Sequence, residues 1–418
     1  MAPDCASAAA GCLFEYDTLK VVHIQSKKIG ILNRLIKLII LGYIVGYVIV
    51  YEKGYQQFST FSSASTTKVK GVLSTEALPD DAFHEFIADK SVYKKVWDFA
   101  DIVYPPVENG LFFVTTNLVI TPNQRMQACP ENVKVKQARC QSRNDATSCE
   151  AGKPLWLGNG LMTGRCVQAP PPNQTLYVCE IFGWCPVEQD YGPLRNGTPL
   201  FREVRNFTVL LKNYIEFPRF HVRRRNIPDQ KNKTYLRNCR YDPITDPLCP
   251  VFRIGDIVEE AGIDFDEIAI KGGVIQILID WDCNLDFCLE ACVPKYSFVR
   301  LDDPNVALSK GWNFRYPKNY NESMRTLVKA YGITFVILVQ GQAGKASLIP
   351  VAINLGSGLG LMVVATVVSD FVVMNCLKRR QLYAANKYEY VSKEDHECPT
   401  NSREAVGCSG LETLCLTS

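Results

Sequence analysis

The stretch that decides the fold is the second long apolar segment, residues 346–377, which reads ASLIPVAINLGSGLGLMVVATVVSDFVVMNCL. Asp370 is its only charged residue, and the basic run Lys378-Arg379-Arg380 follows it directly. A bilayer core about 30 Å thick needs roughly 20 apolar residues in a helix, so this segment is long enough to cross a membrane. We therefore predict a transmembrane helix over residues 346–377.

The polar middle of this segment has two interpretations. Gly356 and Gly360 form a small-xxx-small pattern, which is typical of close helix packing. Alternatively, Ile353, Ser357 and Gly360 recur at i, i+4 and i+7, so in an oligomer they could line a water-filled pore. Asp370 favours a pore, because an intramembrane carboxylate usually faces a bundle interior or an ion path. The segment alone leaves both interpretations open.

A first apolar segment occupies residues 31–51. A cleaved signal peptide ending near Ser62-Ser63-Ala64 is the alternative, but signal peptides normally occupy only the first 15–30 residues or so. We therefore predict that residues 31–51 form a retained transmembrane helix. Basic residues flank the outer ends of both segments, and the positive-inside rule then places residues 1–30 and 378–418 in the cytosol.

The region between the two spans, residues 52–345, has the composition of an extracellular domain. It holds eleven of the 17 cysteines, as expected for disulfides in an oxidising compartment, although spacing alone leaves their connectivity open. The central cysteines form no C-x-x-C pair and the four histidines are scattered, so we expect no metal site. All five glycosylation sequons also fall here, at Asn173, Asn196, Asn206, Asn232 and Asn321.

The secondary structure of this region is predicted to be mainly β. Segments rich in β-branched and aromatic residues predict strands at residues 110–120, 207–211, 273–281 and 332–339. Residues 80–89 and 254–261 are the candidate helices. The predicted fold class is thus a membrane protein in which two transmembrane helices flank a large, disulfide-rich, mainly β extracellular domain.

Few residues carry recognisable chemistry. The chain has neither a Walker loop nor a dinucleotide fingerprint, and 46 Lys+Arg against 43 Asp+Glu argues against a nucleic-acid binder. Lys68 and Lys70 lie two residues apart, on one face of an extended segment, and Arg315 and Lys329 precede the second span. Basic residues usually lie on a solvated surface, so their spacing alone does not decide whether they bind an anion.

At these residues the chain resembles the ATP-gated cation channels, the P2X purinergic receptors. The matching motifs run from Phe14 to Lys387, and their joint order and spacing is specific although each motif is short. They include Glu52-Lys-Gly-Tyr-Gln56, Thr67-Lys-Val-Lys-Gly71, Asn206-Phe-Thr208, Trp281-Asp-Cys-Asn-Leu-Asp286, Asn313-Phe-Arg315, Lys329-Ala-Tyr-Gly332 and Gly356-Ser-Gly358.

The resemblance implies a plasma-membrane homotrimer or heterotrimer that opens a non-selective pore for Na⁺, K⁺ and Ca²⁺ when extracellular ATP binds between subunits. ATP, with or without Mg²⁺, is then an agonist rather than a cofactor, the protein is not an enzyme, and its partners are two further subunits and membrane lipid. The residues implied to bind phosphate are Lys68, Lys70, Asn313, Arg315 and Lys329, with Thr208 at the adenine and Leu236 near the ribose.

The resemblance also implies five disulfides and favours the pore interpretation of Ile353, Ser357 and Gly360. The implied pairs are Cys129–Cys185, Cys140–Cys166, Cys149–Cys179, Cys239–Cys249 and Cys283–Cys292. Three features depart from the family pattern: Cys288 has no partner in this scheme, residues 75–95 form a longer segment than the family norm, and Arg223-Arg224-Arg225 is unusually basic.

Two other functions deserve comparison with a P2X channel. A trimeric channel of the acid-sensing or epithelial sodium type would also have two spans, but it lacks the Lys-Val-Lys and Asn-Phe-Arg motifs. An ecto-nucleotidase would need acidic residues for a metal ion and a glycine-rich phosphate loop, and we find no such set beside the lysines.

Overall fold

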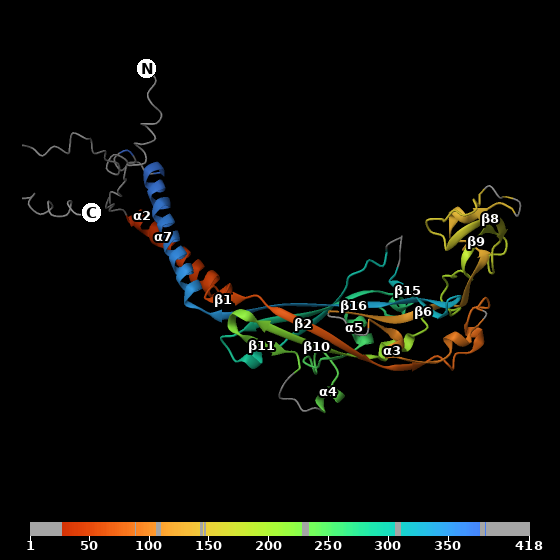
Figure 1. The fold of residues 1–418 in the computed structure, drawn as a ribbon. Helices are drawn as coiled ribbons and strands as arrows, with labels where there is room; N and C mark the ends of the chain where they lie inside the picture. Colours follow the sequence, from red (N-terminus) through yellow and green to blue (C-terminus); the bar gives the residue numbers. More distant parts are fainter. Residues whose placement is uncertain are drawn as a thin grey trace, which may run out of the picture. The chain divides into compact units, whose positions relative to one another are not determined.

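The computed structural model describes residues 27–376 and residue 381, apart from residues 88, 106–109, 143–144, 146–147, 228–233 and 306–310. The sequon residue Asn232 and most of both predicted cytosolic segments therefore lie outside the described residues. The chain divides into two compact units, one of Met1–Gln57 with Ser347–Ser418 and one of Phe58–Ala346 (Figure 1).

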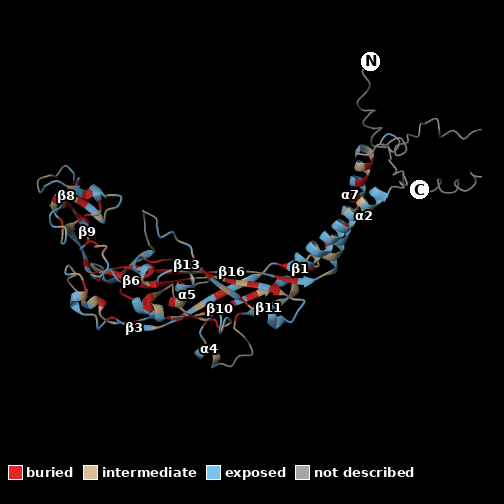
Figure 2. Ribbon diagram, turned by 180° about the vertical axis from the view of Figure 1, so that it is seen from behind, coloured by how far each residue is buried: buried red, intermediate tan, exposed pale blue. Residues whose placement is uncertain are grey.

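The first unit contains two long apolar helices. The first begins as α2 (Lys27–Gly42) and continues as the π-helical turn element η1 (Tyr43–Tyr51), and the second is α7 (Leu348–Cys376). Their most apolar windows have mean hydropathies of 1.9 and 2.0 and are almost entirely exposed, as the pale blue colouring in Figure 2 shows. Exposed apolar surface of this length is what a membrane span requires. The first helix begins four residues before the predicted span.

One face of α7 packs against the first helix. Gly358, Ala365, Ser369 and Val373 are buried and recur at four- or seven-residue spacing, so they share a side of the helix. A Cβ added at Gly358 would lie 2.9 Å from Cδ1 of Ile44, which is too close for ordinary contact. A larger side chain at this position would therefore require the Ile44 side chain to move.

The residues of the predicted pore stripe lie on a different side of α7. Ile353, Ser357 and Gly360 are exposed, and a Cβ added at Gly356 or Gly360 would meet no atom within 4 Å. Helix packing inside one chain therefore uses Gly358 and leaves the stripe available to water or to neighbouring subunits.

The second unit is built on a ten-stranded sheet with the path β14-β13-β16-β6-β9-β7. The long central strands β13 and β16 pair in parallel, whereas β16 and β6 are antiparallel. The strands predicted at residues 110–120, 273–281 and 332–339 correspond to parts of longer strands in this sheet. The strands of this sheet are β1 (Gln56–Ser59), β5 (Val103–Tyr104), β6 (Leu111–Pro130), β7 (Arg139–Cys140), β8 (Gly160–Gln168), β9 (Tyr177–Cys185), β13 (Gly273–Asn284), β14 (Lys295–Arg300), β15 (Asn313–Asn321) and β16 (Met324–Ala346).

A four-stranded sheet of order β11-β10-β12, with β2 also paired to β10, packs in the same unit. It contains β2 (Ser62–Lys70), β10 (Thr208–Phe217), β11 (Val222–Arg225) and β12 (Val251–Arg253), and β3 (Val72–Ser74) pairs with β4 (Val96–Asp98) apart from it. The described helices of the unit are short: α3 (Phe99–Ile102), α4 (Tyr235–Asn238), α5 (Ile254–Glu260) and α6 (Phe265–Lys271).

The two sheets are joined by a buried polar bridge. Nε1 of Trp281, on β13, donates a hydrogen bond of 2.8 Å to Oδ1 of Asn213, on β10. The amide of Asn213 in turn donates to Oγ of Ser63, at 2.9 Å, and to the carbonyl of Ala64. Both Trp281 and Asn213 are completely buried. Neither polar group has access to water, so each depends on the other.

Disulfides stabilise the lobe around β8 and β9, whose separate apolar cluster is small and includes three buried disulfide cysteines, Cys149, Cys166 and Cys179. The five described disulfides are Cys129–Cys185, Cys140–Cys166, Cys149–Cys179, Cys239–Cys249 and Cys283–Cys292. Cys288 is an exposed free thiol.

The helix predicted over residues 80–89 is wrong, whereas the one predicted over residues 254–261 corresponds to α5. Only Asp80–Ala82 forms a helical turn. The segment then runs alongside residues 193–195, where the backbone N–H of Arg195 donates to Ala82 and that of His84 donates to Pro193. Phe83 is fully buried, and its tertiary packing outweighs the weak local helix preference.

We predict that Asn213→Ala destabilises the extracellular unit. The substitution leaves the Trp281 N–H buried without an acceptor, which costs about 1–3 kcal/mol. Thermal unfolding of the purified protein should begin several degrees lower than in the native chain, whereas the exposed Asn319→Ala on β15 should leave it unchanged. Equal unfolding temperatures for both variants would show that the bridge contributes little.

Candidate functional site

The first group of predicted ligand residues lies on the four-stranded sheet. Lys68 and Lys70 are exposed and flank the buried Val69 on β2. The pairing of β2 with β10 places Thr208 directly opposite Lys70. The structure therefore brings these three residues to one surface, where, among the described residues, neither lysine forms an ion pair. We call this group the first cation cluster.

The second group lies on the ten-stranded sheet. Arg315 on β15 is paired with Lys329 on β16, and Asn313 is paired with Tyr331 two positions further along. Lys329 is only 4% exposed, which is unusual for a lysine. We call Asn313, Arg315 and Lys329 the second cation cluster. Leu236 is half-buried on the separate short helix α4.

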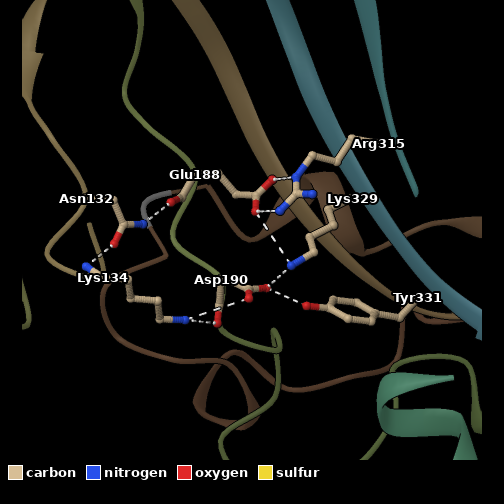
Figure 3. A network of polar contacts seen from close by, with 7 residues as sticks. All are labelled: Asn132, Lys134, Glu188, Asp190, Arg315, Lys329 and Tyr331. Atoms are coloured by element: carbon tan, nitrogen blue, oxygen red, sulfur yellow. Dashed lines mark hydrogen bonds and ion pairs between the residues drawn. The ribbon is translucent and has the colours of Figure 1, made fainter. Parts of the chain in front are cut away.

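Two carboxylates that our sequence reasoning missed neutralise the second cation cluster. Arg315 donates two parallel hydrogen bonds of 2.8 Å to the carboxylate of Glu188. Nζ of Lys329 donates at 2.6 Å to Oδ1 of Asp190 and lies 3.8 Å from Oε1 of Glu188. The Tyr331 hydroxyl also donates to Asp190, at 2.6 Å. Figure 3 shows the two acidic side chains pointing at the two cations.

Neighbouring side chains hold the segment that carries these carboxylates by donating hydrogen bonds to its backbone carbonyls. Nδ2 of Asn132 donates to the carbonyl of Glu188 at 2.6 Å, and Nζ of Lys134 donates to the carbonyl of Asp190 at 3.0 Å (Figure 3). Nε2 of Gln124 donates to the carbonyl of Pro186 at 2.8 Å. These contacts hold the backbone from which Glu188 and Asp190 reach the cations.

The protonation states follow from these contacts. Burial alone would raise the pKa of Asp190, but the hydrogen bonds from Lys329 and Tyr331 outweigh it and the pKa lies below its usual value. Burial and the bond to Asp190 raise the pKa of Tyr331, and the bond to Glu188 raises that of Arg315. At neutral pH Asp190 is therefore ionised, Arg315 is protonated and the Tyr331 hydroxyl is neutral. The second cation cluster is an anion site that holds the chain's own carboxylates.

The spacing of Glu188 and Asp190 in the sequence is a signal that could have identified them. Glu188 and Asp190 are two apart, the same spacing as Lys68 and Lys70, and they follow Cys185-Pro186-Val187. An extended segment would place both on one face, but nothing local to the sequence shows which cations they meet.

Metal chemistry receives little support from the described residues. Two clusters have the compactness of a metal site, one of Cys140, Cys149 and Cys179 and one of Cys239, Asp246 and Cys249. Every cysteine in both is disulfide-bonded and so offers no thiolate.

Comparison with known proteins identifies the family to which this architecture belongs. The family model described as ATP P2X receptor matches residues 14–390. The mouse P2X purinoceptor 4 is 44% identical over 94% of this chain and 97% of its own length. The human P2X purinoceptor 5 is 40% identical over 97% of this chain and 89% of its own length.

Solved structures agree with the sequence comparison. An invertebrate P2X receptor from the Gulf Coast tick, crystallised with ATP and Zn²⁺, is 69% identical with a TM-score of 0.78, over 82% of this chain and 99% of that one. The chicken P2X7 receptor, crystallised with the competitive antagonist TNP-ATP, is 33% identical with a TM-score of 0.69 over the same shares.

The fold and the site thus define a ligand-gated membrane channel: two apolar helices near the termini and a β-rich, disulfide-bonded domain that carries an anion site. More specifically, the chain belongs to the ATP P2X receptor family, whose members are trimeric ATP-gated cation channels of the plasma membrane and not enzymes. This membership confirms the resemblance and decides against the acid-sensing channel and the ecto-nucleotidase.

We predict that Asp190→Asn makes the channel more sensitive to ATP. The amide keeps the size of the side chain and still accepts from Tyr331, but it no longer offers Lys329 a competing negative charge. A change of about 1 kcal/mol corresponds to a roughly fivefold lower half-maximal ATP concentration, measured by whole-cell recording.

The exposed Asp81→Asn serves as the control for this measurement. An unchanged or higher half-maximal concentration in Asp190→Asn, with normal surface expression, would mean that Asp190 does not compete with ATP.

Proposed function

We propose that one ATP molecule joins the first cation cluster of one subunit to the second cation cluster of its neighbour, and that its phosphates displace Glu188 and Asp190. The observation that carries this proposal is the second cluster itself, in which Arg315 and Lys329 already bind two carboxylates. A triphosphate offers more charge and more acceptor oxygens than the two carboxylates, and charge-assisted hydrogen bonds of this kind are the strong ones.

Each ligand residue then has a definite role. Lys68, Lys70, Asn313, Arg315 and Lys329 bind phosphate oxygens, Thr208 contacts the adenine and Leu236 packs near the ribose. The two clusters lie on different sheets of one subunit, and nothing in that arrangement requires them to face each other. This supports a site in which each cluster faces the other cluster of a neighbouring subunit. ATP, with or without Mg²⁺, acts as an agonist and is not hydrolysed.

Opening of the channel follows from a difference in ATP affinity between its states. Lys329 lies on β16, which ends at Ala346, and α7 begins at Leu348, so the chain connects the ATP site to the second span without an intervening loop. When phosphates replace the carboxylates, a movement of β16 can therefore be transmitted to the pore through a short stretch of backbone.

The pore is proposed to be lined by Ile353, Ser357 and Gly360 and to pass Na⁺, K⁺ and Ca²⁺. The exposure of this stripe, on a side of α7 other than the Gly358 face, supports the assignment. Lipid would cover the remaining exposed apolar surface of both helices.

The proposed topology places residues 1–30 and 378–418 in the cytosol, spans at residues 31–51 and 346–377, and residues 52–345 outside. Glycosylation is then expected at Asn173, Asn196, Asn206, Asn232 and Asn321. Asn196 and Asn321 are exposed, as glycan attachment requires.

We predict that Lys70→Ala and Lys329→Ala each weaken the response to ATP. Loss of a charge-assisted hydrogen bond costs about 1.5–3 kcal/mol, so the half-maximal ATP concentration should rise roughly ten- to a hundredfold. Coexpression of the two variants should restore a sensitive component that neither shows alone, because some interfaces then receive both intact lysines.

Arg223→Ala is the matched control, since Arg223 is a surface residue paired with Glu216 outside the site. If neither lysine variant changes the response while trimers still reach the surface, the two lysines do not bind ATP.

We predict that Ser357→Cys reacts faster with a charged thiol reagent when ATP is present, because an open pore admits the reagent to this face of α7. The measure is the rate of irreversible current change. Val363→Cys, on an exposed position of α7 outside the stripe, is the comparison. Equal slow rates with and without ATP at Ser357→Cys would favour helix packing for the stripe.

A further inference from the structure

A cavity of about 480 Å³ lies beside the acidic segment of the ATP site. One wall comes from Phe86, Ile87, Asp89 and Tyr93, a second from β6 near Ile120 and a third from residues 186–191. None of the residues proposed to bind ATP lines it. Its volume is in the range of small-molecule sites, which are mostly apolar with a few placed polar groups. We propose that this cavity binds a neutral aromatic small molecule that weakens the response to ATP.

Aromatic side chains form the walls and are held in place. The Tyr93 hydroxyl accepts from the backbone N–H of Ile120 at 2.8 Å and donates to the carbonyl of the same residue at 3.3 Å. The ring of Phe86 meets that of Tyr191 edge-on, with centroids 5.4 Å apart. Fixed aromatic walls favour an aromatic occupant, because stacked and edge-to-face ring contacts add to the burial of apolar area.

The charges around the cavity select a neutral molecule. Among the described lining residues there is no lysine, arginine or histidine, so the cavity wall itself offers an anion no counter-ion. Asp89 is the only lining carboxylate, and its Oδ1 already accepts from the backbone N–H and the hydroxyl of Ser91. Gln189 and Asn123 remain as polar lining groups that can orient the occupant by hydrogen bonds.

The third wall of the cavity is also the segment that blocks the second cation cluster. Along it the side chains alternate: Val187, Gln189 and Tyr191 line the cavity, whereas Glu188 and Asp190 bond to Arg315 and Lys329. Figure 3 shows the acidic side of this segment. An occupant of the cavity therefore braces the same backbone from which the two carboxylates reach the cations.

The first wall belongs to residues 75–95, the segment that we expect from the sequence to be longer than the family norm. Its attachment to residues 193–195, through the backbone bonds of Ala82 and His84, fixes it against the chain that continues from the acidic segment. The attachment of this segment therefore also fixes one wall of the cavity.

The direction of the effect follows from linkage. The cavity has this shape while Glu188 and Asp190 hold the cations, so a molecule that fits it stabilises the arrangement that ATP must disrupt. ATP must then weaken binding of that molecule by the same factor by which the molecule weakens binding of ATP. This inference rests on the proposed ATP site.

The test tethers a neutral ring inside the cavity of the full-length channel. Ile87→Cys, a lining position on the wall opposite the acidic segment, is made in a Cys288→Ser background to remove the exposed thiol. Treatment with benzyl methanethiosulfonate should raise the half-maximal ATP concentration at least threefold. The methyl reagent, which is too small to fill the cavity, should raise it less. Saturating ATP should slow the benzyl reaction, as followed by mass spectrometry.

The controls separate this inference from the proposed function. Leu157→Cys, which is 70% exposed and outside the cavity, should react without changing the ATP response. Val187→Cys replaces Ile87→Cys if the latter fails to reach the surface. Complete benzyl modification with unchanged ATP potency, or no reaction at either position, overturns the inference. A normal ATP current in the same experiment means that the proposed function still stands. Absence of ATP current in the unmodified chain instead contradicts the function.

Discussion

A buried lysine is the constraint on which the rest of the site depends. Removing an ammonium group from water costs several kcal/mol unless an opposite charge accompanies it, and Lys329 is almost fully buried. The strand register gives it only another cation, Arg315, as its nearest partner on β15. The chain therefore has to supply anions whenever no ligand does, and Glu188 and Asp190 fulfil that need. Agonist binding on this scheme is an exchange of one set of anions for another.

The position of Lys329 is fixed because β16 is paired on several sides. This 23-residue strand pairs with β6, β13 and β15, so displacement of Lys329 alone would break a ladder of hydrogen bonds. Exchange of carboxylates for phosphates is accordingly expected to move the less regular acidic segment first. That segment has no ladder of its own and is held by individual side-chain bonds from Asn132, Lys134 and Gln124.

The sequence predicted the parts of the fold that depend on local pattern. Apolar length located α2 and α7, β-branched runs located the first parts of β6, β10 and β13 and the middle of β16, and alternation placed Lys68 and Lys70 on one face. It failed where tertiary contacts decide. Residues 80–89 have a helical composition, yet Phe83 is taken into the core and the backbone pairs elsewhere. Glu188 and Asp190 could not be assigned to Arg315 and Lys329, since more than 120 residues separate each pair along the chain. The disulfide pairing came from family resemblance and not from spacing.

The hydrogen bond between Asn213 and Trp281 has a consequence for the whole trimer. The first cation cluster lies on the sheet of Asn213, and the second lies on the sheet of Trp281. In the proposed ATP site, each subunit contributes one cluster to the interface on one side and the other cluster to the interface on the other side. A bridge that ties the two sheets of a subunit together therefore ties two agonist sites together as well. Occupation of one site is expected to bias its neighbour around the ring, so that the steepness of the ATP concentration–response curve depends on an amide and an indole that touch no ligand.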